Sequence, residues 1–212
     1  ALTNQTFERL PIFRQSFFIL LFSVFLNRKI MKMKKILAFA GSNSSTSINH
    51  QLVEFAASQI TAHEVKVIRL TDYPLEMFSE DVEREKGYSV ELRLLKNEIA
   101  DADALLISAN EHNRAPSAFF KNILDWLSRL EYKFLKDKKI LLMSTSNGKL
   151  GASSSLAILK TILPRFDGEV VESFSFPSFE DNFSVEDQKI TDELLALGFK
   201  DVLENFQQQI DL

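Results

Sequence analysis

The chain has 212 residues, of which 45% are hydrophobic, and its 29 acidic residues outnumber its 25 basic ones to give a formal net charge of -4. This length suits one large domain or two small ones, and the apolar content is sufficient for a buried core. The acidic balance argues against nucleic acid as a partner, because nucleic-acid binding needs a basic patch. Cysteine is absent from the sequence, which excludes disulfides and thiolate sites, and the three histidines show no metal-ligand spacing, so we predict no metal site.

The first 33 residues differ from the rest of the chain. Their apolar run at 16–26 is shorter than the roughly 20 residues that span a bilayer. Basic residues precede this run, as in a signal peptide, but no small-residue cleavage site follows it. Met31 and Met33 lie just before the first predicted strand, where a protein could begin. We expect residues 1–33 to be a disordered leader or to precede the natural start, and a membrane anchor is the alternative.

A strand, a hydroxyl-rich loop and a helix follow in that order. Residues 35–40 form a short apolar run that predicts a buried strand, and residues 51–57 have helical periodicity. The first N–H groups of a helix lack intrahelical partners and carry partial positive charge, so the loop at 41–49 can hold an anion. Five hydroxyl residues fall between Ser42 and Ser47, whereas one is enough to cap a helix. We predict a phosphate site, with helix capping alone as the alternative.

The composition of this loop also indicates the kind of phosphate. The dinucleotide fingerprint needs three spaced glycines and the P-loop needs a lysine, but this loop has one glycine and no lysine. Backbone N–H groups and serine hydroxyls can surround a terminal phosphomonoester without a metal or a cation. The loop therefore favours a phosphomonoester.

Strands and helices alternate from Lys34 to the C-terminus. Further strands are predicted at residues 65–70, 104–108, 139–143 and 169–173. Further helices are predicted at residues 89–101, 115–130, 153–163 and 185–209. The periodic face of the second helix is marked by Val90, Leu94, Leu95, Glu98 and Ile99. We expect the charged stretch 79–88 to be exposed, and Trp126 to pack in the core or at an interface.

This alternation predicts an α/β fold with a five-stranded parallel sheet and helices on both faces. Five strands suit the order 2-1-3-4-5, in which ligands bind at the carboxyl ends of the strands, at the switch point between the first and third. The loops after the first, third and fourth strands should therefore build the site.

The loops after the third and fourth strands are polar. Asn110 to Asn113 form a turn whose backbone amides can meet a flat heteroaromatic ring, and the alternative for His112 is a plain surface histidine. Residues 144–152 contain two glycines, which let the backbone approach a ligand closely. The alternative for this third loop is a plain strand-to-helix connection.

Two of these segments together resemble a known family, the NADPH-dependent FMN reductases, a flavodoxin-like group that includes azo, quinone and chromate reductases. The family's phosphate loop is similar to Gly-Ser-x-x-x-x-Ser-x-Asn, met here by Gly41, Ser42, Ser47 and Asn49. Its second motif is similar to Pro-Glu-Tyr-Asn followed by Leu-Lys-Asn-x-x-Asp-Trp, met here at residues 110–113 and 120–126. Three positions depart from the pattern: Ser44 replaces an arginine, Asn110 a proline and His112 a tyrosine. The resemblance covers about residues 34 to 175.

The resemblance implies a flavodoxin-like three-layer sandwich over residues 34–212 and FMN as the cofactor. It implies an oxidoreductase in which NADPH or NADH donates a hydride and a small acceptor, such as a quinone, an azo compound or a flavin, takes the electrons. It also implies a cytoplasmic homodimer or homotetramer that needs no membrane. The residues expected to bind the cofactor are Ser42, Ser44, Ser47, Ile48, Asn49, Asn110, Glu111, His112, Asn113, Ser146, Asn147 and Gly148.

The sequence contains no Ser-His-Asp order, motif of paired carboxylates or His-Glu-x-x-His. We expect the cofactor to carry the chemistry and therefore name no catalytic residue. Two alternatives remain: a non-enzymatic flavodoxin-like module for electron transfer or redox sensing, and a member of the fold that binds another phosphorylated ligand.

Overall fold

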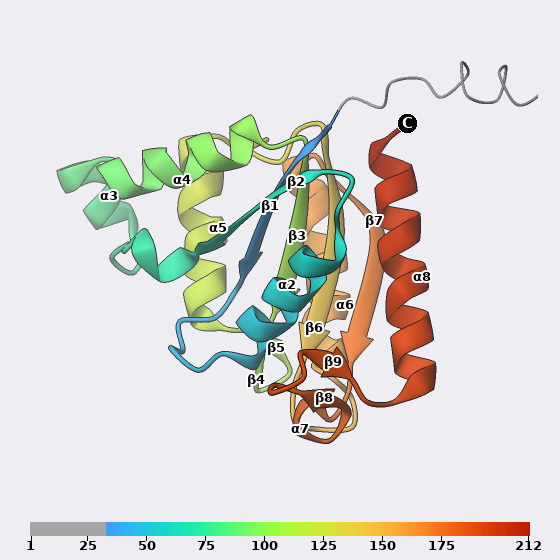
Figure 1. Cartoon of the computed structure of the whole chain (residues 1–212). Coiled ribbons are helices and arrows are strands. Elements are labelled where there is room, and N and C mark those ends of the chain that lie inside the picture. Colours follow the sequence, from blue (N-terminus) through green and yellow to red (C-terminus); the bar gives the residue numbers. More distant parts are fainter. Residues whose placement is uncertain (1–32) are drawn as a thin grey trace, which may run out of the picture. The chain divides into compact units, whose positions relative to one another are not determined.

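The computed structural model describes residues 33–212, so the leader predicted at residues 1–33 lies, apart from its last residue, outside the described residues. Strands and helices alternate as the sequence predicts (Figure 1). The strands are β1 (Lys35–Ala40), β2 (Glu64–Arg69), β3 (Ala104–Ala109), β4 (Glu111–His112), β5 (Ala115–Pro116), β6 (Lys138–Thr145), β7 (Gly168–Phe176), β8 (Phe183–Ser184) and β9 (Lys189–Ile190). The helices are α2 (Ile48–Gln59), α3 (Glu80–Lys86), α4 (Val90–Asp101), α5 (Ala118–Leu130), α6 (Ser153–Ile162), α7 (Phe179–Asn182) and α8 (Glu193–Ile210). Within residues 33–212, no helix combines the length and the apolar character needed to cross a membrane.

Five parallel strands form one sheet in the order β2-β1-β3-β6-β7. Because β4 and β5 pair with each other in a separate small sheet, this is the predicted 2-1-3-4-5 order, and the flavodoxin-like fold is confirmed. Strand β1 lies between β2 and β3, with Ala40 as the register partner of Arg69 on one side and of Ser108 on the other. The carboxyl ends of β1 and β3 therefore form the switch point at which such sheets bind ligands.

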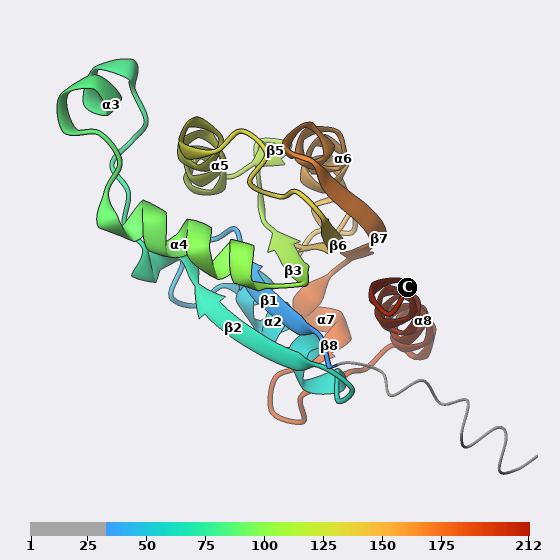
Figure 2. The ribbon, with the colours of Figure 1, turned by 90° about the horizontal axis from the view of Figure 1, so that it is seen from above.

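Helices cover both faces of the sheet and complete three layers, which are visible from above in Figure 2. On one face, α4, α5 and α6 bury Leu95, Leu124 and Leu159 against the sheet. On the other face, α2 and α8 bury Leu52 and Phe206. Side chains alternate between the two faces of a strand, so strands covered on both sides are apolar throughout, and every residue of β3 is buried.

The helix predicted at 115–130 begins later than expected. Its cap is Ser117, whose hydroxyl accepts a hydrogen bond from the Phe120 N–H at 3.1 Å. Ala115 and Pro116 instead form β5, which pairs antiparallel with β4. The predicted start at Ala115 was wrong, because the hairpin holds Ala115 and Pro116 outside the helix.

The last helix, predicted at 185–209, also begins later than expected. Asp192 caps α8 by accepting a hydrogen bond from the Leu195 N–H at 2.8 Å. The residues before it form α7 and the β8–β9 hairpin instead. The Phe183 ring of this hairpin packs edge-on against Phe55 of α2, with the ring centroids 5.2 Å apart. A contact across more than a hundred residues thus overrides the local helical pattern.

The predicted buried face of α4 is only partly correct. Leu95 and Ile99 are buried as expected, but Val90 and Leu94 are 66% and 52% exposed. Leu92 takes their place in the core, because it lies three residues from Leu95 and so shares its side of the helix.

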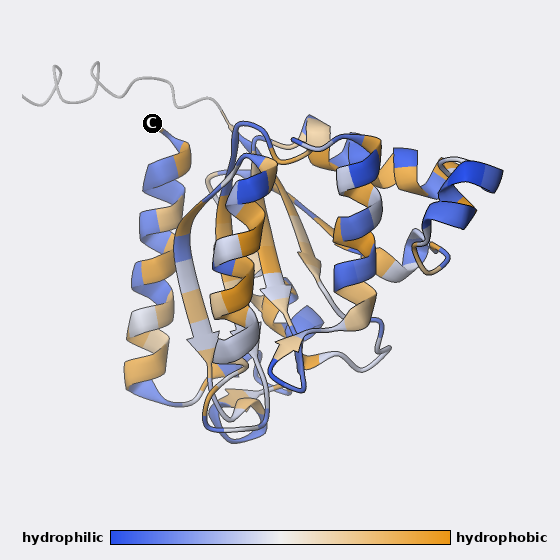
Figure 3. Ribbon diagram, turned by 180° about the vertical axis from the view of Figure 1, so that it is seen from behind, coloured by the Kyte–Doolittle hydropathy of each residue, from blue (hydrophilic) through white to orange (hydrophobic). Residues whose placement is uncertain are grey.

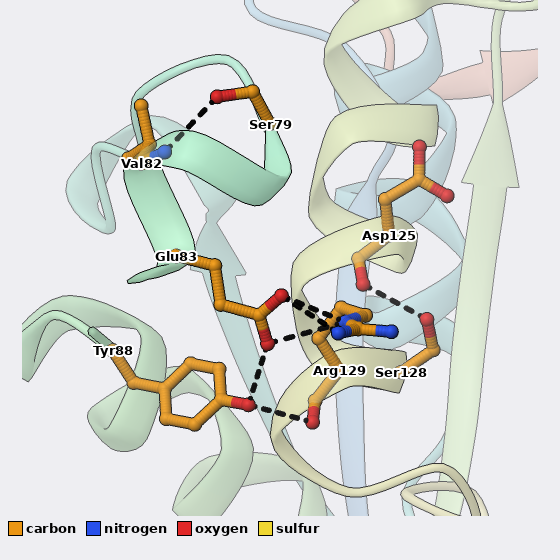
Figure 4. A network of polar contacts seen from close by, with 7 residues as sticks. All are labelled: Ser79, Val82, Glu83, Tyr88, Asp125, Ser128 and Arg129. Carbon is orange, nitrogen blue, oxygen red and sulfur yellow. Dashed lines mark hydrogen bonds and ion pairs between the residues drawn. The ribbon is translucent and has the colours of Figure 1, made fainter. Parts of the chain in front are cut away.

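The charged stretch 79–88 is exposed as predicted and includes α3, which has no buried residue and is mostly blue in Figure 3. A polar network fastens it to α5 (Figure 4). The Glu83 carboxylate accepts hydrogen bonds from Arg129 Nε at 3.0 and 3.1 Å and from the Tyr88 hydroxyl at 2.8 Å. These hydrogen bonds lower the pKa of Glu83, with Arg129 as the largest cause.

Trp126 is buried in the core, as predicted. Its indole N–H donates to the Glu76 carbonyl at 2.8 Å, and the neighbouring Asn122 amide donates to the same carbonyl at 3.0 Å. Asn122 Oδ1 also accepts from the Phe78 N–H at 2.7 Å. Asn122 and Trp126, both in α5, thus hold the loop that follows β2 against this helix.

Candidate functional site

The hydroxyl-rich loop at 41–47 joins β1 to α2 at the carboxyl end of the sheet (Figure 1). Gly41 anchors its start, because its N–H donates to the Ser108 carbonyl at 2.9 Å and its carbonyl accepts from the Ser117 hydroxyl at 2.8 Å. A Cβ at Gly41 would lie 2.6 Å from the Phe120 ring, a distance at which atoms clash. Close packing of the chain against α5 therefore requires glycine here.

The hydroxyl groups of the loop stabilise its shape. Ser47 caps α2 by accepting a hydrogen bond from the His50 N–H at 3.2 Å. Ser42 Oγ accepts from the Ser44 N–H at 3.2 Å, and Ser44 Oγ accepts from the Thr46 N–H at 3.3 Å. Ser42 is half-buried, and Ser44 and Thr46 are exposed, so their hydroxyls can still reach a ligand. Capping by Ser47 is confirmed, and phosphate binding by the loop stays a prediction.

The first turn of α2 adds backbone donors to this loop. Within residues 33–212, the N–H groups of Ser47, Ile48 and Asn49 have no hydrogen-bond acceptor. The helix dipole favours an anion at this position. The Ile48 side chain packs against the core beneath α2, so its contribution to a ligand would come from its N–H.

Asn49 has a different environment from the one expected for a phosphate ligand. Its side chain is buried, and Asn49 Oδ1 accepts hydrogen bonds from the Ser108 hydroxyl at 2.8 Å and the Thr145 N–H at 3.1 Å. Its Nδ2 donates to the Thr145 carbonyl at 3.1 Å. Ser108 lies near the end of β3 and Thr145 ends β6, so Asn49 ties the first turn of α2 to two neighbouring strands. We infer a positioning role for this side chain.

The second predicted loop is a tight hairpin of β4 and β5. Asn113 and Arg114 form its turn with φ of 51° and 64°, the left-handed pair of a type I′ turn. His112 is exposed, and its Nε2 lies 3.4 Å from Asn110 Nδ2. Asn110 Oδ1 is buried and has no hydrogen-bond donor within residues 33–212. An acceptor without a donor is costly in a folded protein and marks this loop as incomplete by itself.

One oxygen of the Glu111 carboxylate bonds to α6, and cofactor binding by Glu111 stays a prediction. Its Oε2 accepts a hydrogen bond from the Ser155 N–H at 3.0 Å, and the Ser155 hydroxyl donates to the Asn110 carbonyl at 2.9 Å. Ala152, which precedes α6, has a φ of 62° and provides no side-chain cap. Glu111 therefore supplies the cap from another element, where its negative charge also suits the helix dipole.

The third predicted loop is braced by α7, an element that the sequence analysis did not predict. Ser146 and Gly148 accept hydrogen bonds at their carbonyls, both at 3.1 Å, from the N–H groups of Phe179 and Ser178. The exposed Asn147 amide donates to Glu180 Oε1 at 2.7 Å. These hydrogen bonds fix the loop against α7.

The structure brings the three predicted loops to one edge of the sheet. They follow β1, β3 and β6, which are direct neighbours, and the Asn49 hydrogen bonds connect the first turn of α2 to the ends of β3 and β6. Ser42 is half-buried and Ser44 is exposed at this edge, whereas Ser47 is buried as the cap of α2. The Asn49 and Glu111 side chains form hydrogen bonds within the protein. Within the described part of the chain, no group of three or more His, Asp or Glu side chains could hold a metal ion.

A hollow of about 430 Å³ lies beside this edge and was not predicted. It is lined by Ala40, Ser42, Asn43, Ser44, Ser45, His50, Arg69, Leu70 and Thr71. Burial is the largest cause that lowers the pKa of His50, and the nearby Arg69 charge lowers it further, while Glu54, with Oε1 3.2 Å from His50 Nε2, acts in the opposite direction. The sequence feature that could have indicated this hollow is Arg69. It is a basic residue at the end of β2, and β2 is the neighbour of β1 in the predicted strand order.

Comparison with known proteins places these features in context. A sequence profile described as NADPH-dependent FMN reductase matches residues 34–181. The chain is 29% identical over 143 residues to the NADH:(hydroxy)cinnamate reductase subunit CrdA of Vibrio ruber, a match that covers 66% of this chain and 68% of that protein. It is 32% identical over 107 residues to a quinone reductase of Escherichia coli, which covers 50% of this chain and 56% of that protein. The chain thus spans little more than half the length of this second relative.

Solved structures show the same fold. FerB, described as a flavoenzyme NAD(P)H:(acceptor) oxidoreductase from Paracoccus denitrificans, superposes with a TM-score of 0.72 over 84% of this chain and 98% of that chain. The two sequences are 23% identical, so this likeness concerns the fold.

Proposed function

The chain belongs to the NADPH-dependent FMN reductase family, and from this membership we propose that it binds FMN and uses it to oxidise NADPH or NADH. The electrons would pass to a small acceptor such as a quinone, an azo compound or a flavin. The quinone reductase among its relatives supports a quinone as the first acceptor to test.

The observation that carries this proposal is the convergence of three polar loops at the switch point of the sheet. Ligands of open α/β sheets bind at that position. The Asn49 bridge to Ser108 and Thr145 holds the first turn of α2 against the ends of β3 and β6. A site that is already formed costs less to order when its ligand binds.

The chemistry of the first loop fits the phosphate of FMN. Hydroxyls of Ser42, Ser44 and Ser47 and the unpaired N–H groups at the start of α2 provide donors from several directions. An oxyanion with three terminal oxygens needs such a set of donors, and the helix dipole favours its charge. We propose that these groups hold the phosphate and that the buried Asn49 keeps them in place.

The second and third loops fit a flat ring with several donors and acceptors. Asn110, His112 and Asn113 would border one side through the β4–β5 hairpin, and Ser146, Asn147 and Gly148 would border the other. The Asn110 Oδ1 atom supports this assignment, because it lacks a donor that a ring N–H could provide. Glu111 would act indirectly, since its carboxylate fixes the hairpin to α6.

Bound FMN would supply two-electron redox chemistry between reduced nicotinamide and the second substrate. The protein then needs to bind, orient and shield the reactants, which agrees with the absence of catalytic acid–base motifs from the sequence. No side chain of the described residues is assigned as a proton donor or acceptor.

Flavin fluorescence and the oxidation of NADPH by the purified protein test the proposal. Apo protein titrated with FMN should quench flavin fluorescence to a one-to-one end point, and the complex should oxidise NADPH in the presence of a quinone. Binding of FMN with negligible turnover would favour an electron-transfer module instead. A protein that binds neither FMN nor NADPH would contradict the assignment.

We also propose that the protein is a cytoplasmic homodimer or homotetramer, as the resemblance of its motifs implies. Light scattering coupled to size-exclusion chromatography measures the mass directly, with 24.2 kDa expected for one chain. A monomer at micromolar concentration would contradict the oligomeric part of the proposal.

A further inference from the structure

We propose that the hollow between the hydroxyl-rich loop and the carboxyl end of β2 binds a phosphomonoester dianion, with Arg69 as its cation. The inference rests on the proposed function, because that function supplies the two candidate ligands. One is the phosphate of FMN, and the other is the 2′-phosphate that distinguishes NADPH from NADH.

The position of Arg69 follows from the register of the sheet. Arg69 is the last residue of β2 and pairs with Ala40, the last residue of β1. The hydroxyl-rich loop starts at the next residue, so Arg69 lies beside its entrance. The switch point between β1 and β3 lies on the opposite side of β1. The hollow is therefore next to the predicted flavin edge but on its outer side.

The charged side chain that lines the hollow favours an anion, while the Glu54 and Asp72 carboxylates lie behind the lining, near enough to raise the pKa of His50 against the effect of its burial. Within residues 33–212, Arg69 takes part in none of the ion pairs. None of the residues that line the hollow in this part of the chain carries a carboxylate. By contrast, Lys66, three residues earlier on β2, pairs with Glu98 at 2.6 Å. A guanidinium without a carboxylate partner can form paired hydrogen bonds to a phosphate.

The walls of the hollow supply further polar groups. Ser42, Ser44 and Ser45 line one side from the loop, and Thr71 lines it from the chain after β2. His50, which is 5% exposed, lines it from the first turn of α2. The volume of about 430 Å³ lies within the roughly 300–1,000 Å³ typical of small-molecule sites. Three separate elements thus place hydroxyls, an imidazole and a cation around one space.

The test compares Arg69→Gln with Arg165→Gln. Arg165 is exposed in the turn before β7, it lies outside the hollow, and its substitution removes the same charge. Flavin fluorescence gives the FMN dissociation constant, and steady-state rates at saturating FMN give KM for NADPH and for NADH. Thermal unfolding of apo protein is measured with inorganic phosphate and with chloride at equal ionic strength.

We expect Arg69→Gln to weaken binding about tenfold, a typical effect for loss of one charge-assisted contact. A higher dissociation constant for FMN would assign the hollow to the flavin phosphate. A higher KM for NADPH with an unchanged KM for NADH would assign it to the 2′-phosphate. In apo protein, phosphate should raise the unfolding temperature of the parent chain and of Arg165→Gln by roughly 3 °C, and that of Arg69→Gln by much less.

The phosphate measurement separates this inference from the proposed function. If the protein binds neither FMN nor NADPH, the proposed function fails, but a phosphate effect that depends on Arg69 would still support the hollow as an anion site. If Arg69→Gln and Arg165→Gln differ by less than twofold in both affinities and respond equally to phosphate, the inference is wrong.

Discussion

Substitution of Asn49 by alanine should destabilise the protein in the absence of any ligand. The change removes three hydrogen bonds and leaves the Ser108 hydroxyl and the Thr145 N–H and carbonyl without this partner in a buried region. Each lost hydrogen bond lowers the free energy of unfolding by about 1 kcal/mol, and by more where the unpaired group stays inaccessible to water. The three together predict a decrease of about 3 kcal/mol in the free energy of unfolding, or roughly 6–12 °C in Tm for a domain of this size.

Urea denaturation of apo protein measures this decrease, with fluorescence as the signal because Trp126 is the only tryptophan in the sequence. Asn147→Ala is the matched control. It removes the same type of side chain from an exposed position where it makes one hydrogen bond, to Glu180 at 2.7 Å. That variant should lose less than about 1 kcal/mol.

A second substitution tests whether the loss arises from the Asn49 bridge. Ser108→Ala should cost about 1 kcal/mol in the parent chain but little in Asn49→Ala, because the hydroxyl has then already lost its partner. The positioning role of Asn49 would be refuted if Asn49→Ala were no less stable than Asn147→Ala. Equal costs of Ser108→Ala in both backgrounds would refute it as well.

Three further predictions concern the surroundings of the site. Glu111→Gln should lower the free energy of unfolding by about 1 kcal/mol in urea titrations, because it weakens the cap of α6; an unchanged midpoint would contradict this capping role. Burial lowers the pKa of His50, so the unfolded chain binds more protons between the ordinary histidine pKa of about 6.5 and the lower folded value. The free energy of unfolding should therefore fall as pH drops below about 6.5, and His50→Gln, which cannot titrate, should show a smaller fall over the same range. Gly41→Ala should lose about 1–3 kcal/mol by calorimetry, because its Cβ would lie 2.6 Å from the Phe120 ring; Phe120→Leu should recover part of this loss if the clash is its cause.

The agreement between sequence and structure is best for the strands of the sheet. Residues 35–40 were predicted as a strand and form β1 with the same limits, and residues 104–108 lie within β3. A strand covered by helices on both faces must be apolar throughout, so its signal is contained in a few consecutive residues. The cap at Ser47 is equally local, since a serine caps the N–H three residues ahead of it.

The disagreements occur where another contact competes with a local helical preference. The periodic pattern from 185 extends the last helix too far, because Phe183 packs against Phe55 in a hairpin before α8. Pro116 suits a helix start, yet β4 and β5 pair and hold it in a strand. The Phe55 partner lies far outside the window of sequence in which the helical pattern is read, whereas the partner strand of Pro116 lies five residues away.

The order of elements, the parallel sheet and the position of a hydroxyl-rich loop at the ligand-binding edge all follow from the amino-acid sequence. These features depend on hydrophobic periodicity and on caps, which act over a few residues. The partners of individual polar side chains, by contrast, became visible in the folded molecule. Asn49 meets Ser108 and Thr145 across 59 and 96 residues of chain, and Arg69 lies beside the loop through strand pairing. Hydrogen bonds and charges act between atoms that are close in space. The partners of these side chains therefore come together only when the chain folds.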